Sequence, residues 1–157
     1  MFNILLSVFC YDIWFYVSHI LLHHRYFYCY HYIHHQHGNG GSESTPMYIS
    51  DRGERYAIPT AMDTYKGHWS EGPFQGLGAL VPWAFLEVSW FDFAIVLVLL
   101  NVRGMMQHDQ RFVWLIGNHH LLHHQFPRYN YGEYWLDTLF GTRYPDEAAY
   151  KRGLLYV

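Results

Sequence analysis

The sequence predicts an all-α, membrane-associated helical bundle built around a histidine-rich dimetal centre. Its apolar segments are longer than strands, and short alternations of polar and apolar residues between turn signals are nearly absent. Charged residues make up only 15% of the chain, against about 25% in a typical soluble domain. Thirteen of the 157 residues are histidine, and most of them lie in short clusters. A chain of this length and uniform composition is expected to form a single domain over residues 1–157.

The first apolar segment, Met1 to Leu22, has the length of about 20 residues that a membrane-spanning helix requires. It contains Asn3, Asp12 and His19, which a simple anchor would not carry. It also lacks the basic start and the small-residue cleavage site of a signal peptide. We therefore predict that this segment belongs to the mature fold, as a helix from about Phe2 to Tyr28.

The rest of the chain is also predicted to be helical, apart from one long connection. A short helical turn is expected to carry His31 to His35, and a Gly/Ser-rich loop is expected at about residues 37–60. Further helical segments are expected over residues 70–77, 79–106, 110–124 and 133–140. Pro127 and Gly141 are expected to end the last two of these. The stretch from Ala79 to Val102 is long and apolar enough to enter a bilayer.

Composition also excludes several classes of function. The formal net charge is −3, with 10 Lys and Arg against 13 Asp and Glu and no long basic run, so nucleic acid is not an expected partner. Cys10 and Cys29 form no Cys-x-x-Cys pair, so neither a disulfide framework nor a cysteine-based zinc site is expected.

The histidine clusters have spacings that suit metal binding. His19 and His23 are four residues apart, which places both rings on one face of a helix. The pattern H-x-x-H-H occurs twice, and the same interval of twelve residues separates each copy from an upstream histidine. The sequence therefore contains H-x11-H-x-x-H-H in two places, although Phe112 stands where the second copy would match His23. The spacing of these clusters predicts that nine histidines are metal ligands: His19, His23, His31, His34, His35, His108, His120, His123 and His124.

Nine imidazoles exceed the three or four ligands of a single zinc site, so two metal ions fit the count better. Iron, zinc and copper all accept nitrogen ligands, and the sequence does not choose between them. His24 and His37 are interpreted as ordinary residues. Carboxylates and further histidines are expected to orient the ligand rings from behind. Asp12 is the first candidate, because it lies two turns before His19, and Asp109, Asp137 and His119 are weaker candidates.

These motifs resemble the fatty acid hydroxylase and sterol desaturase superfamily, whose members are membrane-bound, histidine-box, di-iron enzymes. The three boxes match residues 12–23, His31-Tyr-Ile-His34-His35 and His120-Leu-Leu-His123-His124. Asn130-Tyr131-Gly132, followed by Trp135, Asp137 and Phe140-Gly141-Thr142, is similar to the family's ending after its last box. His68-Trp-Ser-Glu71 resembles a His-x-x-Glu element between the second and third boxes, which adds His68 to the candidates for orienting a ligand.

The resemblance implies an O2-dependent oxidoreductase that hydroxylates or desaturates a C–H bond of a sterol or fatty-acyl lipid. It implies two iron ions, with zinc as an alternative in purified protein, and O2 as co-substrate. No dinucleotide-binding or haem motif is present, so an external donor such as a cytochrome b5-type protein or a reductase is expected to supply electrons. The expected location is the endoplasmic reticulum membrane in a eukaryote or the inner membrane in a bacterium.

Two other hypotheses remain at this point. A dizinc hydrolase would use a bridging water as nucleophile, but such sites usually include carboxylates, which the boxes lack. A non-catalytic metal-binding membrane protein is the other, because family members usually carry hydrophobic helices before the first box and only 18 residues precede His19 here.

Overall fold

The computed structural model describes residues 1–35, 47–49, 55–57 and 59–152. Helices dominate the described part of the chain, as the sequence predicts. The one exception is a short antiparallel hairpin that pairs β1 (Met47–Ile49) with β2 (Arg55–Ala57). This hairpin falls within the predicted loop at about residues 37–60, and most of the remainder of that loop lies outside the described residues.

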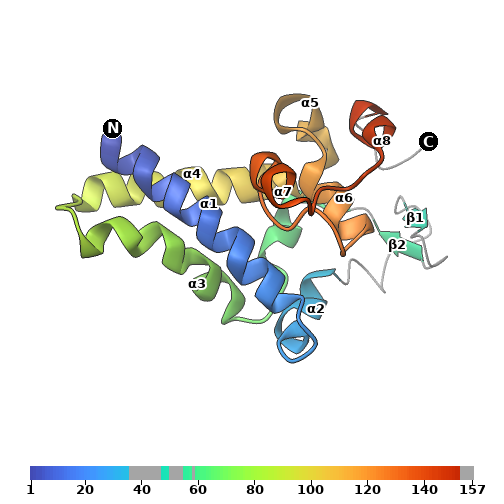
Figure 1. Cartoon of the computed structure of the whole chain (residues 1–157), viewed down its shortest axis with the longest axis horizontal. Helices are drawn as coiled ribbons and strands as arrows, with labels where there is room; N and C mark the ends of the chain where they lie inside the picture. The colour runs from blue at the N-terminus through green and yellow to red at the C-terminus, as the bar shows by residue number, and fades with distance from the viewer. Residues whose placement is uncertain (36–46, 50–54, 58, 153–157) are drawn as a thin grey trace.

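The longest helices lie side by side at one end of the molecule (Figure 1). Helix α1 (Phe2–Leu22) packs against α4 (Trp90–Gln107), against α3 (Glu71–Gly76) and against the 3-10 helix η2 (Leu77–Ala84). Gly78 allows the closest of these approaches, since an added Cβ there would lie 2.5 Å from the Cβ of Trp14. The hydroxyl of Ser89 accepts the N–H of Asp92 at 3.0 Å and so caps the start of α4.

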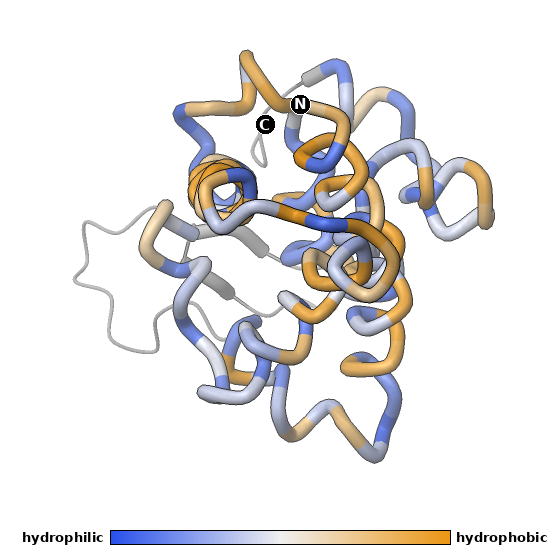
Figure 2. The backbone as a smooth tube through the Cα atoms, turned by 90° about the vertical axis from the view of Figure 1, so that its left-hand side faces the viewer, coloured by the Kyte–Doolittle hydropathy of each residue, from blue (hydrophilic) through white to orange (hydrophobic). Residues whose placement is uncertain are grey.

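Helices α1 and α4 are both long and apolar enough to cross a membrane. Little of α4 is covered by the rest of the chain, and Trp90, Phe91 and Val98 are among its most exposed side chains. Viewed from the end at which these helices start, the backbone carries long stretches of hydrophobic residues (Figure 2). An apolar outer face of this kind is suited to contact with lipid.

Shorter helices form the other end of the molecule. These are α2 (Tyr28–His35), η1 (Ala61–Tyr65), η3 (Gln110–Phe112), α5 (Val113–Ile116), α6 (His119–Gln125), α7 (Tyr134–Phe140) and α8 (Glu147–Arg152). Buried Leu121 and Leu122 of α6 pack with Ala149 of α8 in a small hydrophobic core. The side chain of Asn118 donates to the carbonyl of Ala149 at 2.9 Å and holds α8 in place.

Three predicted helical segments have other bounds in the structure. The segment expected over residues 79–106 is divided into η2, which ends at Ala84, and α4, which Ser89 caps. The first helix ends at Leu22 rather than near Tyr28, because the chain turns at His23 to start α2. The helix expected over residues 110–124 is divided into η3, α5 and α6, since Gly117 adopts a positive φ of 77° that ends α5. The predicted helix at residues 133–140 is confirmed, and Gly141 closes α7 in the left-handed conformation.

Candidate metal centre

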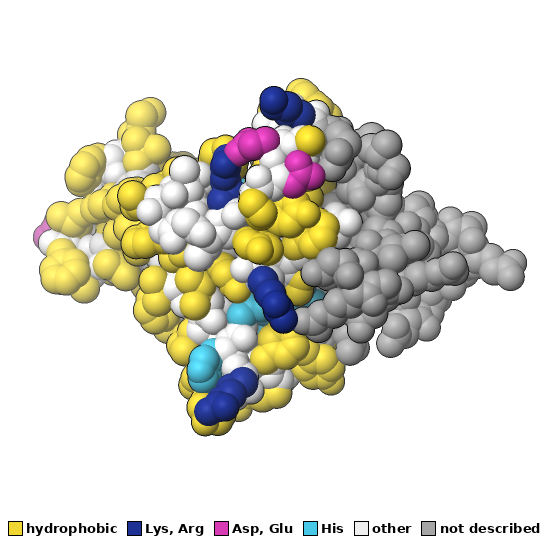
Figure 3. Space-filling view, turned by 45° about the vertical axis from the view of Figure 1, so that its right-hand side comes forward, with side chains coloured by type: hydrophobic (Ala, Val, Ile, Leu, Met, Phe, Trp, Pro, Cys, Tyr) yellow, Lys and Arg dark blue, Asp and Glu magenta, His cyan; other side chains and the backbone are white. Residues whose placement is uncertain are grey.

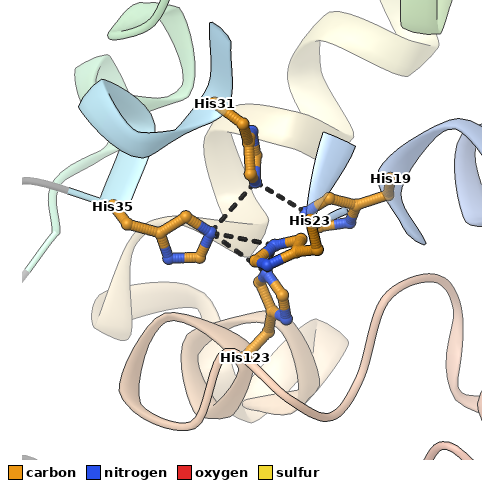
Figure 4. Close-up of side chains that lie close together, drawn as sticks. All are labelled: His19, His23, His31, His35 and His123. Atoms are coloured by element: carbon orange, nitrogen blue, oxygen red, sulfur yellow. Dashed lines mark hydrogen bonds between the residues drawn. The ribbon is translucent and has the colours of Figure 1, made fainter. Parts of the chain in front are cut away.

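The nine predicted histidines converge from three helices, α1, α2 and α6, and from the residues that end α1 and α4, into two adjoining groups. In each group, the ligating nitrogens lie within 4.8 Å of one another. The five-histidine group consists of His19, His23, His31, His35 and His123 (Figure 4). The four-histidine group consists of His34, His108, His120 and His124.

In both groups, the distance between the Nε2 atoms of neighbouring rings is close to that between two adjacent ligands of one metal ion. In the five-histidine group, the Nε2 of His31 lies 3.0 Å from that of His19 and 2.9 Å from that of His35. The Nε2 of His123 lies 3.1 Å from that of His23 and 3.3 Å from that of His35. All five rings therefore point their Nε2 atoms towards one place (Figure 4).

The four-histidine group repeats this spacing. The Nε2 of His108 lies 3.0 Å from that of His34 and 3.1 Å from that of His120. The Nε2 of His124 lies 3.2 Å from that of His120. His108 follows the last residue of α4, so the end of a long helix delivers this ligand.

Backbone carbonyls accept hydrogen bonds from the Nδ1 atoms of several rings, on the side opposite to the converging Nε2 atoms. The Nδ1 of His19 donates to the carbonyl of Tyr131 at 2.6 Å, and the Nδ1 of His123 donates to that of Tyr129 at 2.6 Å. In the other group, the Nδ1 of His34 donates to the carbonyl of Lys66 at 2.8 Å. The Nδ1 of His108 donates to that of Gly104 at 2.7 Å. A carbonyl can only accept, so each of these rings carries its proton on Nδ1 and has a lone pair on Nε2.

Glu71 performs the same task for His31. Its Oε1 lies 2.7 Å from the Nδ1 of His31, and the carboxyl is almost completely buried at the start of α3. Burial raises the pKa of Glu71 to about 8. Gly67 lets the carboxyl fit, because a Cβ at that position would lie 2.7 Å from its Oε2. The sequence signal for this residue was the His-x-x-Glu element, of which Glu71 rather than His68 touches a ligand.

Burial keeps the histidines neutral. Desolvation, reinforced by neighbouring histidines, holds the pKa of His31, His35, His120 and His123 well below its usual value. Burial also lowers the pKa of His23 to about 2. Neutral imidazole is the form that binds a metal. The site therefore presents its lone pairs before any metal arrives.

Asp137 organises the loop that carries two of the supporting carbonyls. This fully buried carboxylate accepts the N–H of Tyr131 at 2.9 Å and that of Gly132 at 2.8 Å. It also accepts the hydroxyl of Thr142 at 2.6 Å and lies 3.0 Å from the Nε2 of His119. Asp137 thus acts on His19 through the backbone of Tyr131. His119 joins neither histidine group and instead supports Asp137.

Two other candidates for orienting the ligands have different partners. Asp12 was expected to support His19, but two turns of helix separate them by about 10 Å, and its carboxylate pairs with Arg103 of α4 at 2.5 Å. Asp109 accepts the N–H of Arg111 at 2.9 Å and pairs with its guanidinium, so it caps η3.

His68, another candidate for orienting a ligand, does not contact either group. Its ring lies 2.7 Å from the hydroxyl of Ser70 and packs against Tyr30. Of the two histidines interpreted as ordinary, His24 is exposed and joins neither group, and His37 lies outside the described residues.

A cavity of about 450 Å³ opens onto both groups. Helices α1, α3 and α4 and the segment around η1 form its walls, with Phe15, Leu97 and Leu100 among the apolar side chains. The rings that reach it are His19 and His31 of the first group and His34, His108 and His120 of the second. A molecule in this cavity would therefore lie against both groups at once.

The fold and the site together define a helical protein with two long apolar helices and a paired histidine centre. A family model described as fatty acid hydroxylase matches residues 55–142, which is more than half of the chain. The chain therefore belongs to the fatty acid hydroxylase family, a family of membrane-bound oxidoreductases. No curated protein and no solved structure matched the chain.

Proposed function

We propose that the protein is an O2-dependent di-iron oxidoreductase that hydroxylates or desaturates a C–H bond of a membrane lipid. The nine histidines hold the two iron ions, five on one ion and four on the other. When bound, the irons supply the activation of O2. Family membership supports the reaction class, and the paired groups support two ions.

One contact carries the proposal of a metal centre. The Nε2 atoms of His34 and His108 face each other at 3.0 Å while both Nδ1 protons are committed to carbonyls. Two neutral rings in this state offer two lone pairs to each other and cannot form a hydrogen bond. A cation between them resolves this conflict. His19 and His123 carry the same commitment in the other group.

The spacing within the groups also fits metal coordination. With metal–nitrogen bonds of about 2.1 Å, two ligands at right angles lie about 3.0 Å apart. The Nε2 atoms of neighbouring rings in the two groups are separated by 2.9 to 3.3 Å. Nitrogens at these separations could therefore hold one ion in the five-histidine group and a second in the four-histidine group.

The chain's own residues prepare the site for lipid. The cavity brings the substrate alongside both groups, and Phe15 and Leu100 provide apolar contacts near it. The burial of the histidines excludes bulk water from the reaction. Glu71, Asp137 and the backbone carbonyls fix the rings, so that the ligand geometry does not depend on the substrate.

The donor set favours oxygen chemistry over a dizinc hydrolase. Among the described residues, both groups consist of histidine alone, whereas hydrolytic dizinc sites usually include carboxylates. Zinc can still occupy such a site in purified protein. A non-catalytic metal-binding protein would need neither the cavity nor its access to both groups.

The distribution of positive charge supports an orientation in the membrane. All ten Lys and Arg lie outside residues 1–24 and 67–102, so none falls in the connection between Ala84 and Trp90. Basic residues flanking membrane helices favour the cytoplasmic side. The histidine end then faces the cytoplasm, where an external electron donor can reach it. This arrangement fits the endoplasmic reticulum membrane of a eukaryote or the inner membrane of a bacterium.

The proposal is tested by product analysis. Protein reconstituted with Fe(II) in lipid bilayers, with a reductant and O2, is expected to yield lipids that have gained one oxygen atom or lost two hydrogens, detected by mass spectrometry. His124→Ala should abolish the products, and Glu87→Gln, at an exposed position remote from the site, should not. Folded, iron-loaded protein that consumes O2 without altering sterols or acyl chains would contradict the proposed reaction.

A further inference from the structure

The cavity beside the histidines changes character along α4. Its lining includes residues from Leu97 of this helix to His108, which follows the helix, and this stretch measures about 16 Å along the helix axis. Leu97 and Leu100 line the part farther from His108, whereas Arg103 and Gln107 line the part next to it. The cavity therefore has an apolar part, towards the start of α4, and a polar part that adjoins the metal ligands.

Arg103 and Gln107 are four residues apart, so their side chains share one face of α4. The Nη2 of Arg103 donates to Asp12 at 2.5 Å, and the Nε2 of Gln107 donates to Glu133 at 2.8 Å. Asp12 and Glu133 are not among the described residues that line the cavity, so the two carboxylates hold these side chains from behind. We call Arg103 and Gln107 the polar pair.

Each side chain of the polar pair keeps one hydrogen-bonding group that the described part of the chain does not use. The Nη1 of Arg103 has no acceptor there, and the Oε1 of Gln107 has no donor. The first group can only donate and the second can only accept. A hydroxyl or an amide satisfies both, because it donates and accepts at the same time. A carboxylate would instead place a lone pair against the Oε1 of Gln107.

The charges around the polar pair also disfavour an anion. The guanidinium of Arg103 pairs with Asp12 and lies 3.6 Å from Glu133, so its single positive charge already faces two carboxylates. Lys66 is the other cation among the described residues that line the cavity, and it pairs with Asp63. An anionic headgroup would therefore find both cations already compensated.

The outer surface of the molecule has the same polarity as the cavity. Hydrophobic side chains predominate at the end where α1 and α4 begin, whereas most of the visible charged side chains lie towards the histidine end (Figure 3). The start of α4 is therefore the end that suits lipid chains. A lipid in the cavity can keep its apolar part towards that end and its polar group towards the histidines.

We propose that the substrate is a lipid with an uncharged hydroxyl or amide group, which the polar pair holds next to His108. The apolar part of the lipid extends past Leu100 and Leu97, away from the histidines. The C–H bond that reacts therefore lies near the hydroxyl or amide group rather than at the far end of the lipid. This inference rests on the proposed function, because it takes the occupant of the cavity to be the substrate.

The test compares three radiolabelled probes with the same chain and different ends: hexadecan-1-ol, hexadecanamide and hexadecanoate. Their binding to the iron-loaded full chain in detergent is measured by scintillation proximity without O2, at about pH 8, where a carboxyl group is ionised. We expect the alcohol and the amide to bind about tenfold more tightly than hexadecanoate. Cholesterol and a ceramide, added as competitors, then distinguish a sterol from an acyl lipid as the source of the hydroxyl or amide.

Two variants test the polar pair itself. Gln107→Leu removes the free acceptor and should weaken binding of hexadecan-1-ol about fivefold or more. Gln75→Leu makes the same change at a cavity residue of α3 and should have a smaller effect. Glu133→Gln removes one of the two carboxylates behind Arg103, so binding of hexadecanoate should rise about fivefold. Glu147→Gln, at an exposed carboxylate of α8, is its matched control.

The orientation of the lipid is tested by photolabelling. Hexadecan-1-ol with a diazirine at its last carbon should label α4 near Leu97 and Leu100, because the end opposite to the hydroxyl lies there. Label on α6 would place that end against the histidines and would overturn the orientation. This readout needs neither O2 nor turnover.

The outcomes separate the two proposals. Equal affinities for hexadecan-1-ol and hexadecanoate, or equal losses in Gln107→Leu and Gln75→Leu, would overturn the inference. If Gln107→Leu does not fold with its metal, Glu133→Gln decides, and a response equal to that of Glu147→Gln would overturn the inference. Protein that binds the probes as expected and holds iron, but oxidises no lipid when O2 and a reductant are added, would count against the proposed function alone.

Discussion

His34 and His123 occupy equivalent positions in the two halves of the repeated histidine pattern, and each one belongs to the group that the other half builds. The first half contributes His19, His31 and His35 to the five-histidine group but sends His34 to the other. The second half contributes His108, His120 and His124 to the four-histidine group and sends His123 across. Neither group can be completed by one half of the chain, so the centre ties α1 and α2 to α4 and α6.

Glu71 should strengthen metal binding through His31. Replacing Glu71 with Gln keeps the shape of the side chain but removes the carboxyl group, which can ionise beside His31 once a cationic metal is bound and so polarise the ring. Metal affinity, measured by competition with a chromophoric chelator, is expected to fall about 10- to 100-fold. Glu87→Gln, at an exposed position, should leave the affinity unchanged. An unchanged affinity in Glu71→Gln would show that the contact at 2.7 Å does not support the ligand.

Asp137 should be a determinant of both stability and metal affinity. In Asp137→Asn, one side-chain oxygen becomes a donor and can no longer accept from Gly132 or Tyr131. A buried donor left without a partner costs about 1–3 kcal/mol. The free energy of unfolding in denaturant should fall by at least about that amount, and metal affinity should fall with it. Glu147→Gln, at an exposed carboxylate, is the control, and equal stabilities of the two variants would refute the role.

Gly78 should be required for the packing of η2 on α1. An added Cβ would lie 2.5 Å from Trp14 Cβ and 2.8 Å from Tyr11 Cα, which forces the helices apart. Gly78→Ala is expected to cost about 1–3 kcal/mol of stability, seen as a lower thermal midpoint in detergent. Gly76→Ala provides the comparison, because its Cβ would meet nothing within 4 Å. The packing argument fails if Gly76→Ala is the more damaging of the two.

Acid should destabilise the metal-free protein. Burial lowers the folded-state pKa of His31, His35, His120 and His123, so these rings remain neutral while the unfolded chain gains protons below about pH 6.5. Stability is therefore lost as pH falls. Glu71 acts in the opposite sense between its pKa of about 8 and the usual value of 4.5, but it is one group against several.

Thermal midpoints recorded with a chelator should consequently drop from pH 7 to pH 5.5. Bound metal should protect at pH 7 and be released in acid, because protons compete for the same nitrogens. A midpoint that rose as the pH was lowered would contradict the neutral, buried state of the rings.

The histidine clusters could be predicted because helix periodicity converts their spacing directly into shared faces. The repeat at an interval of twelve residues was visible as well, and it corresponds to contacts at 3.0 Å between His19 and His31 and at 3.1 Å between His108 and His120. The exchange of His34 and His123 could not be predicted, since it depends on how the helices cross. The division of the ligands into five and four has the same origin.

The supports behind the rings were harder to predict. Several rings are held by backbone carbonyls, which the sequence cannot single out because every residue has one. These are the carbonyls of Tyr131, Tyr129, Lys66 and Gly104. Asp12 shares a helix face with His19, but two turns of helix are too long for its side chain to span. Its carboxylate pairs instead with Arg103 of α4, a partner that the spacing along the first helix does not reveal. Helix boundaries failed at His23 and Gly117, where tertiary contacts and a positive φ override the apolar pattern.

Metal content per chain tests the central claim most directly. The full chain, purified in mild detergent and analysed for iron and zinc together, is expected to hold about two metal ions. His34→Ala and His123→Ala should each reduce that number, the first by weakening the four-histidine group and the second by weakening the five-histidine group. Folded protein without stoichiometric metal, or variants with the full complement of two ions, would contradict the assignment of the nine histidines as the ligands of a dimetal centre.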